Sequence, residues 1–205
     1  MRYKENFLIF CSAKGGVGKT SICTSLALSL LELGKKVLVI DLDFALAKVE
    51  VLLGIKPFRT MRDLPALNFE FKKIVSSGLW GIDLVSCGRG LSWIDSLSKK
   101  DLELLLGNWQ SFRKDYDFIL VDTSPTLQNI QLASLFQNGT PVLITTPEVP
   151  SILDTYLTMK TLAQKANLVE FKLCINAVQS FSESRKVYDV MLKLSSQKFG
   201  ARFEF

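Results

Sequence analysis

The sequence contains no histidine among its 205 residues. This absence excludes histidine-based acid–base catalysis and histidine ligation of a metal ion. Any catalysis by the chain must therefore use carboxylates, lysines, hydroxyl groups, backbone amides or a bound ion.

Long hydrophobic runs are also missing. The longest, such as Phe7 to Phe10 and Val37 to Ile40, are far shorter than the roughly 20 apolar residues of a membrane-spanning helix. The segment from Met1 to Asn6 is short and charged, and it lacks the apolar stretch and cleavage site of a signal peptide. These features predict a cytoplasmic protein.

Cysteine is scarce and scattered. The four cysteines, Cys11, Cys23, Cys87 and Cys174, include no pair with CxxC spacing. Without a secretion signal, we expect reduced thiols rather than disulfides. The spacing also argues against an iron–sulfur cluster, because Cys87 has no second cysteine placed beside it.

The chain is basic, with a net charge of +5 and a pI of about 9.0. Such a balance is compatible with nucleic acid or anionic lipid. The lysines and arginines are dispersed, however, and no segment holds a run of five like charges. Solvated faces are therefore favoured over a nucleic-acid surface.

Short apolar runs alternate with helical segments along the chain. Strands are predicted over residues 7–11, 37–40, 80–86, 118–121, 142–145 and 171–175, and helices over 19–33, 101–114, 151–167 and 183–199. Gly34 should end the first helix, Ser151 should cap the third, and residues 200–205 look like the start of another strand. This order predicts an α/β fold with a doubly wound, mostly parallel sheet covered by helices on both faces. We expect a single domain over residues 1–205, truncated at its C-terminus.

The most informative segment is the run from Ser12 to Thr20, SAKGGVGKT, between a predicted strand and a predicted helix. Its glycines let several backbone amides curl onto phosphate oxygens, and the helix start adds unpaired donors. Lys19 can reach the β and γ phosphates, and the Thr20 hydroxyl suits Mg²⁺. Ala13 stands where the strict P-loop pattern has glycine, which works if its φ is negative. The segment thus predicts binding of Mg-ATP or a similar nucleotide.

Aspartates follow two of the predicted strands. Asp41 and Asp43 come after the second strand, and Asp122 ends a later one. Carboxylates at the C-terminal ends of parallel strands face the crevice in which such sheets bind ligands. They could also cap following helices, and Asp41 in particular is compatible with a structural role.

The run KGGVGKT resembles the deviant Walker A motif of the MinD/ParA family of ATPases. The resemblance implies that Lys14 reaches across an ATP-bridged homodimer to the partner's phosphates, and that Asp43 orients the attacking water. It also implies that Asp122 holds Mg²⁺ and that Asn176, at the end of a strand, contacts adenine. The implied catalytic residues are Lys14, Lys19 and Asp43, and the implied metal-site residues are Thr20, Asp43 and Asp122. The implied ATP-binding residues are Lys14, Gly15, Gly16, Val17, Gly18, Lys19, Thr20, Ser21 and Asn176.

Within this family, residues 41–56, 145–162 and 176–200 look most like the FlhG (YlxH/FleN) branch. That resemblance implies control of flagellar number or placement, with an FlhF-type GTPase or flagellar components as partners. It further implies attachment to the inner membrane surface through a C-terminal helix that lies beyond the end of this chain. The segment before Phe7 is too short for the branch's FlhF-activating helix.

Two residues depart from the family pattern. Ala177 stands where an arginine often follows the asparagine, and Thr126 occupies a switch position that is commonly glycine. Threonine cannot match the conformational range of glycine, so a nucleotide-binding scaffold with little hydrolysis is an alternative. Plasmid or chromosome partitioning, or selection of the division site, is a second alternative because the same ATPase site would serve it.

Overall fold

The computed structural model of the chain describes residues 6–43, 48–78, 80–88, 113–125, 139–196 and 202–204. It forms two compact units. One comprises Met1–Lys19 and Pro125–Phe205 and is called here the loop unit. The other comprises Thr20–Ser124 and is called the aspartate unit.

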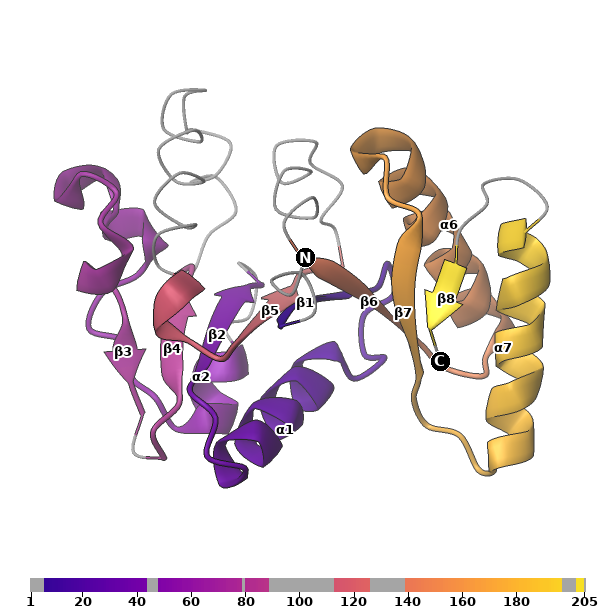
Figure 1. Ribbon diagram of the computed structural model, residues 1–205, viewed down its shortest axis with the longest axis horizontal. Helices are drawn as coiled ribbons and strands as arrows, with labels where there is room; N and C mark the ends of the chain where they lie inside the picture. The colour runs from indigo at the N-terminus through magenta and orange to yellow at the C-terminus, as the bar shows by residue number, and fades with distance from the viewer. Residues whose placement is uncertain are drawn as a thin grey trace. The chain divides into compact units, whose positions relative to one another are not determined.

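The loop unit contains four parallel strands in the order β1-β6-β7-β8. Its strands are β1 (Phe7–Cys11), β6 (Thr140–Thr145), β7 (Glu170–Ile175) and β8 (Arg202–Glu204). Helix α6 (Val149–Ala166) connects β6 to β7, and α7 (Phe181–Ser196) connects β7 to β8 (Figure 1). Because both crossovers step in the same direction, right-handed connections place α6 and α7 on one face, where they contact each other.

The aspartate unit contains four strands in the order β3-β4-β2-β5. Strands β2 (Val37–Leu42), β4 (Asp83–Ser86) and β5 (Phe118–Thr123) are parallel, whereas β3 (Ser76–Ser77) pairs antiparallel with β4. Every residue of β2 is buried, as its unbroken apolar run predicts for a strand covered on both faces. The unit also holds α1 (Lys19–Glu32), α2 (Lys48–Leu53) and short 3₁₀ helices at Met61–Asp63, Pro65–Leu67, Phe71–Lys73 and Arg113–Asp115.

Most predicted elements are confirmed with small shifts at their ends. Gly34 ends α1 in a left-handed conformation with φ of 73°, and its amide donates to Leu31. The last strand is confirmed as β8, which pairs with β7. Strand β4 begins at Asp83 rather than residue 80, because a turn closed by the Gly81 amide on the Gly78 carbonyl interrupts the run.

The predicted Ser151 cap is wrong. Helix α6 begins at Val149 and its N-cap is Glu148, so Ser151 is a buried residue inside the first turn. Pro150, whose fixed φ suits the first helical positions, moves the start forward. Of the helix predicted over 101–114, residues 101–112 lie outside the described residues, and the last two belong to the short 3₁₀ helix Arg113–Asp115. Thr126 also lies outside the described residues.

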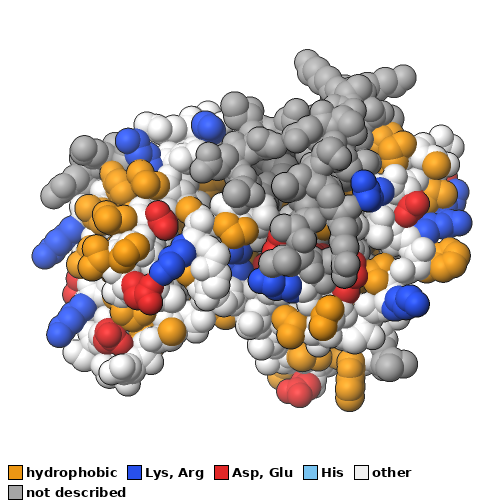
Figure 2. Space-filling view, turned by 180° about the vertical axis from the view of Figure 1, so that it is seen from behind, with side chains coloured by type: hydrophobic (Ala, Val, Ile, Leu, Met, Phe, Trp, Pro, Cys, Tyr) orange, Lys and Arg blue, Asp and Glu red, His pale blue; other side chains and the backbone are white. Residues whose placement is uncertain are grey.

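The described surface mixes charges of both signs. On the face seen in Figure 2, lysine and arginine side chains are interspersed with acidic and apolar ones. This pattern agrees with the dispersion of basic residues in the sequence. No helix in the described ranges has the length and apolar character needed to cross a bilayer.

Candidate nucleotide-binding site

The loop after β1 has the backbone that a phosphate cradle requires. Gly16 and Gly18 have φ values of 79° and 97°, which side-chain-bearing residues rarely adopt. Ala13 is not among the residues with positive φ, so alanine is accommodated at the position where glycine is usual. A Cβ atom added at Gly15 or Gly16 would meet nothing within 4 Å, which leaves open space beside the loop. The backbone conformation therefore requires glycine at positions 16 and 18, whereas Gly15 faces open space.

Ser12 ties together the two lysines of the loop. Its hydroxyl donates a 2.8 Å hydrogen bond to the Lys14 carbonyl and accepts one, also 2.8 Å, from the Lys19 ammonium. Lys19 is only 7% exposed, so its charge is largely removed from water. The sequence interpretation did not select Ser12, although its place directly after β1 and ahead of the glycines was a usable signal.

Asn176 lies next to the same loop. Its side-chain amide donates to the Val17 carbonyl at 2.9 Å, and its backbone amide donates to Thr145 at 2.8 Å. β7 is one strand removed from β1, with β6 between them, so the turn after β7 reaches the loop at the same edge of the sheet. Asn176 is thus brought to the phosphate loop, and the following Ala177 has a left-handed backbone with φ of 56°.

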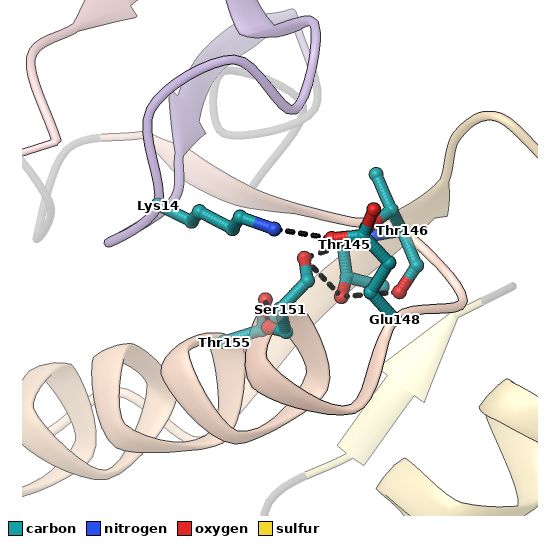
Figure 3. A network of polar contacts seen from close by, with 6 residues as sticks. All are labelled: Lys14, Thr145, Thr146, Glu148, Ser151 and Thr155. Atoms are coloured by element: carbon teal, nitrogen blue, oxygen red, sulfur yellow. Dashed lines mark hydrogen bonds and ion pairs between the residues drawn. The ribbon is translucent and has the colours of Figure 1, made fainter.

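Lys14 points along the surface of the loop unit toward the start of α6. Its ammonium pairs with the carboxylate of Glu148, and both side chains are partly exposed, at 37% and 64% (Figure 3). The sequence interpretation gave no role to Glu148, which lies within the segment 145–162 that resembles the FlhG branch. The N-terminal turn of α6 is therefore part of the surroundings of the second loop lysine.

In the aspartate unit, Thr20 and Asp122 form a close pair. The Thr20 hydroxyl donates a 2.7 Å hydrogen bond to Asp122, a residue with no exposed surface. Mg²⁺ prefers hard oxygen ligands such as hydroxyl and carboxylate groups. These two oxygens, one at the start of α1 and one at the end of β5, fit such an ion.

Asp41 and Asp43 adopt different roles at the end of β2. The Asp43 amide donates to one Asp41 oxygen at 2.8 Å, and the other Asp41 oxygen is buried without a hydrogen-bond partner among the described residues. Burial raises the pKa of Asp41 to about 7; the Asp43 amide opposes the rise, and the charges of Asp122, Asp43 and Glu50 add to it. Asp41 therefore has a structural part in shaping the turn that carries Asp43.

Cys23 and Ser21 lie on α1 in the aspartate unit. Burial, with the nearby charges of Asp122 and Asp41, raises the pKa of the Cys23 thiol well above its usual range. A thiol held neutral in this way is a packing residue rather than a nucleophile. Ser21, implied to bind ATP, lies exposed on α1, and its carbonyl accepts from Thr24 at 3.2 Å.

Comparison with known families and proteins finds clear similarities for this chain. The AAA domain family designated AAA_31 matches residues 6–167. The antiactivator FleN of Pseudomonas aeruginosa is 29% identical over 184 residues, which cover 90% of this chain and 66% of FleN. The flagellum site-determining protein YlxH of Helicobacter pylori is 29% identical over 197 residues, covering 95% and 66% of the two chains. The chain thus spans less than two thirds of the length of these curated relatives.

A solved structure supports the fold. The septum site-determining protein MinD of Pyrococcus horikoshii, complexed with Mg-ADP, superposes with a TM-score of 0.70 at 22% identity, covering 96% of this chain and 91% of that one. This likeness confirms the predicted doubly wound α/β fold with a mostly parallel sheet.

Proposed function

We propose that this chain, which belongs to the AAA-domain family of P-loop proteins of the MinD/ParA type, is a regulatory ATPase. Its Mg-ATP-dependent dimerisation would control the number or placement of flagella. The observation that carries the proposal is the loop itself, in which Ser12 links the backbone of Lys14 to the buried ammonium of Lys19. A pair of lysines held on one glycine loop suits a nucleotide shared between two protomers.

In this proposal the loop from Lys14 to Ser21 binds the phosphates of ATP. Lys19 exchanges its hydrogen bond with Ser12 for a phosphate oxygen, and the amides around Gly16 and Gly18 donate to the others. Asn176 sits at the edge of the loop, where its amide can turn from the Val17 carbonyl to the adenine base. The side chain needs only to rotate, because the backbone of Asn176 is fixed by the bond to Thr145.

The magnesium-side residues follow the loop without a break, since Thr20 is the next residue after Lys19. Thr20, Asp43 and Asp122 are proposed to hold Mg²⁺, Asp122 through a water molecule. The ion, when bound, neutralises charge that develops on the phosphates. The hydrogen bond between Thr20 and Asp122 keeps the two oxygens on one side of α1 for that purpose.

Asp43 is proposed to orient the water that attacks the γ-phosphate. The bond from its amide to Asp41 fixes the backbone at this position, so the carboxylate is presented from a rigid turn. Phosphoryl transfer depends mainly on positioning and on charge stabilisation, both of which this arrangement would supply. Hydrolysis would then end the dimeric state.

The biological role rests on the relatives. FleN is named an antiactivator and YlxH a flagellum site-determining protein, and the two matches cover 90% and 95% of this chain. We therefore favour flagellar control, with an FlhF-type GTPase or flagellar components as partners and the membrane surface as a second site of action.

Phosphate release under multiple turnover, together with sedimentation in ADP and in a non-hydrolysable ATP analogue, tests the proposal. We expect slow turnover and a dimer only with the ATP analogue and Mg²⁺. A dimer without turnover would instead identify a nucleotide-binding scaffold. Salt-sensitive binding to DNA in the ATP state would identify a partitioning protein.

A further inference from the structure

The side chain of Lys14 is held inside its own protomer by one specific acidic partner. Its ammonium is paired with Glu148 within the loop unit. Figure 3 shows the Lys14 side chain extended from the loop toward the start of α6, with the Glu148 carboxylate turned to meet it. The Lys14 side chain thus lies along the surface of its own protomer.

The pairing has a clear origin in the sheet. β1 and β6 are adjacent parallel strands, with Cys11 opposite Leu143 in the register. Lys14 follows the end of β1 closely, and Glu148 follows the end of β6. Because adjacent parallel strands end at the same edge, the two segments leave the sheet side by side.

The side chain of Glu148 does not cap the helix that it precedes. It is the N-cap of α6, but its side chain makes no capping hydrogen bond. The turn is held instead by Ser151, whose hydroxyl accepts from the Thr146 amide at 3.0 Å and pairs with the Thr145 hydroxyl at 3.1 Å (Figure 3). The carboxylate of Glu148 is therefore available to Lys14.

We propose that Glu148 is a positioning residue. It holds the Lys14 side chain in an ion pair within the monomer, and this pair breaks when two ATP-bound protomers meet. This inference rests on the proposed function, in which Lys14 reaches the partner's nucleotide. The phosphate groups of ATP carry several negative charges in a partly desolvated interface, where they attract a lysine more strongly than one solvated carboxylate does. The free energy needed to break the Lys14–Glu148 pair thereby opposes dimerisation without bound ATP.

The free energy needed to break the Lys14–Glu148 pair is small, because the pair is partly exposed. Exposed ion pairs contribute about 0.2–1 kcal/mol each, and a symmetric dimer must break two of them. Removing the charge of Glu148 should therefore strengthen dimerisation by about two- to thirtyfold. Glu148→Gln is the suitable change, since glutamine has the shape of glutamate and the turn is held by Ser151.

The experiment measures the dimer dissociation constant of the full chain by sedimentation with Mg²⁺ and a non-hydrolysable ATP analogue. Glu70→Gln is the matched control, because it removes the charge from another exposed pair, Glu70–Lys73 at 2.8 Å. We expect tighter dimerisation for Glu148→Gln only. The gain should fall at about 1 M salt, where charges are screened over about 3 Å. ADP affinity of the monomer should not change.

A second readout follows Lys14 directly in the nucleotide-free protein. Competitive acetylation of its amine should be faster in Glu148→Gln than in the wild type, with Lys36 as an internal reference. Equal labelling of Lys14 in both proteins, or a gain in ADP affinity equal to the gain in dimerisation, overturns the inference. So does a wild type that dimerises as tightly as Glu148→Gln. A wild type that stays monomeric overturns the proposed function, and this inference with it.

Discussion

The hydroxyl of Thr20 donates a 2.7 Å hydrogen bond to the carboxylate of Asp122, 102 positions further along the chain. Thr20 lies in the first turn of α1, and Asp122 is the penultimate residue of β5. The pair joins the helix that begins in the phosphate loop to a carboxylate at the strand end. It is the contact through which magnesium and the loop would be coupled in the proposed ATPase.

Thr20→Val should lower the free energy of unfolding by about 1–3 kcal/mol, because a buried carboxylate loses a donor. It should also abolish the gain in nucleotide affinity that Mg²⁺ provides. Urea unfolding and calorimetric titration of ADP with and without Mg²⁺ measure the two effects. Thr24→Val is the matched control: Thr24 donates only to backbone carbonyls of α1, so it should lose less stability and keep the response to Mg²⁺. An unaltered Mg²⁺ response in Thr20→Val would contradict the assignment.

Lys19→Ala should weaken Mg-ATP binding by about 30-fold to 5,000-fold. The range corresponds to about 2–5 kcal/mol for removing one partner of a buried charged pair. Isothermal titration of the full chain measures the affinity, with Lys35→Ala as the exposed control. Wild-type affinity in Lys19→Ala would remove this lysine from the site.

Ser12→Ala should act mainly on the nucleotide-free protein. Loss of the acceptor for the Lys19 ammonium should reduce stability by about 1.5–3 kcal/mol, the contribution of a hydrogen bond to a charged group. The loss should be smaller with saturating Mg-ADP, because a phosphate oxygen replaces the serine. Thermal unfolding with and without nucleotide measures the difference, and Ser25→Ala on the exposed side of α1 is the control. An equal loss in both conditions would show that Lys19 does not change partners.

Asp43→Ala should retain ATP binding and lose hydrolysis by about 100-fold or more, since orienting a reacting group matters in the transition state rather than in ground-state binding. The dimer should consequently persist longer. Phosphate release and sedimentation after a single addition of ATP measure both, with Glu170→Ala, an exposed change on β7, as the control. Turnover at the wild-type rate would show that another residue orients the attacking water.

Much of this architecture could be predicted from local patterns. The buried strands β1, β2 and β5 are continuous apolar runs, and the glycines of the loop mark its conformation directly. Gly16 and Gly18 have the positive φ that makes glycine necessary there. Such features depend on a few neighbouring residues, which is the scale that sequence patterns capture.

The residues that escaped prediction depend on contacts distant in sequence. Glu148 meets Lys14 across 134 positions, and nothing in the run around Glu148 distinguishes it from a solvated carboxylate. The start of α6 was misplaced for a different, local reason: Ser151 has the chemistry of a cap, but its hydroxyl accepts from the Thr146 amide from inside the first turn of the helix. At the start of α7, the Ser180 hydroxyl accepts from the Glu183 amide, and the Glu183 carboxylate accepts from the Gln179 amide. These two bonds resemble a capping box and start the helix at Phe181, ahead of the predicted residue 183.

The last prediction concerns Lys14 itself. If Lys14 reaches across the dimer, Lys14→Ala should leave nucleotide binding to the monomer unchanged and weaken ATP-dependent dimerisation by about 100-fold or more. Two protomers that meet face to face bring two nucleotides together, each with several negative charges. A lysine from the opposite chain offsets that repulsion where a charge counts for more than in water. Lys14→Arg should restore dimerisation only in part, because a planar guanidinium does not occupy the place of a compact ammonium. Sedimentation of the three proteins with ADP and with a non-hydrolysable ATP analogue measures the effect. Normal dimerisation of Lys14→Ala would reduce Lys14 to the surface partner of Glu148, and the loop would then be the site of an ATPase that does not share its nucleotide between protomers.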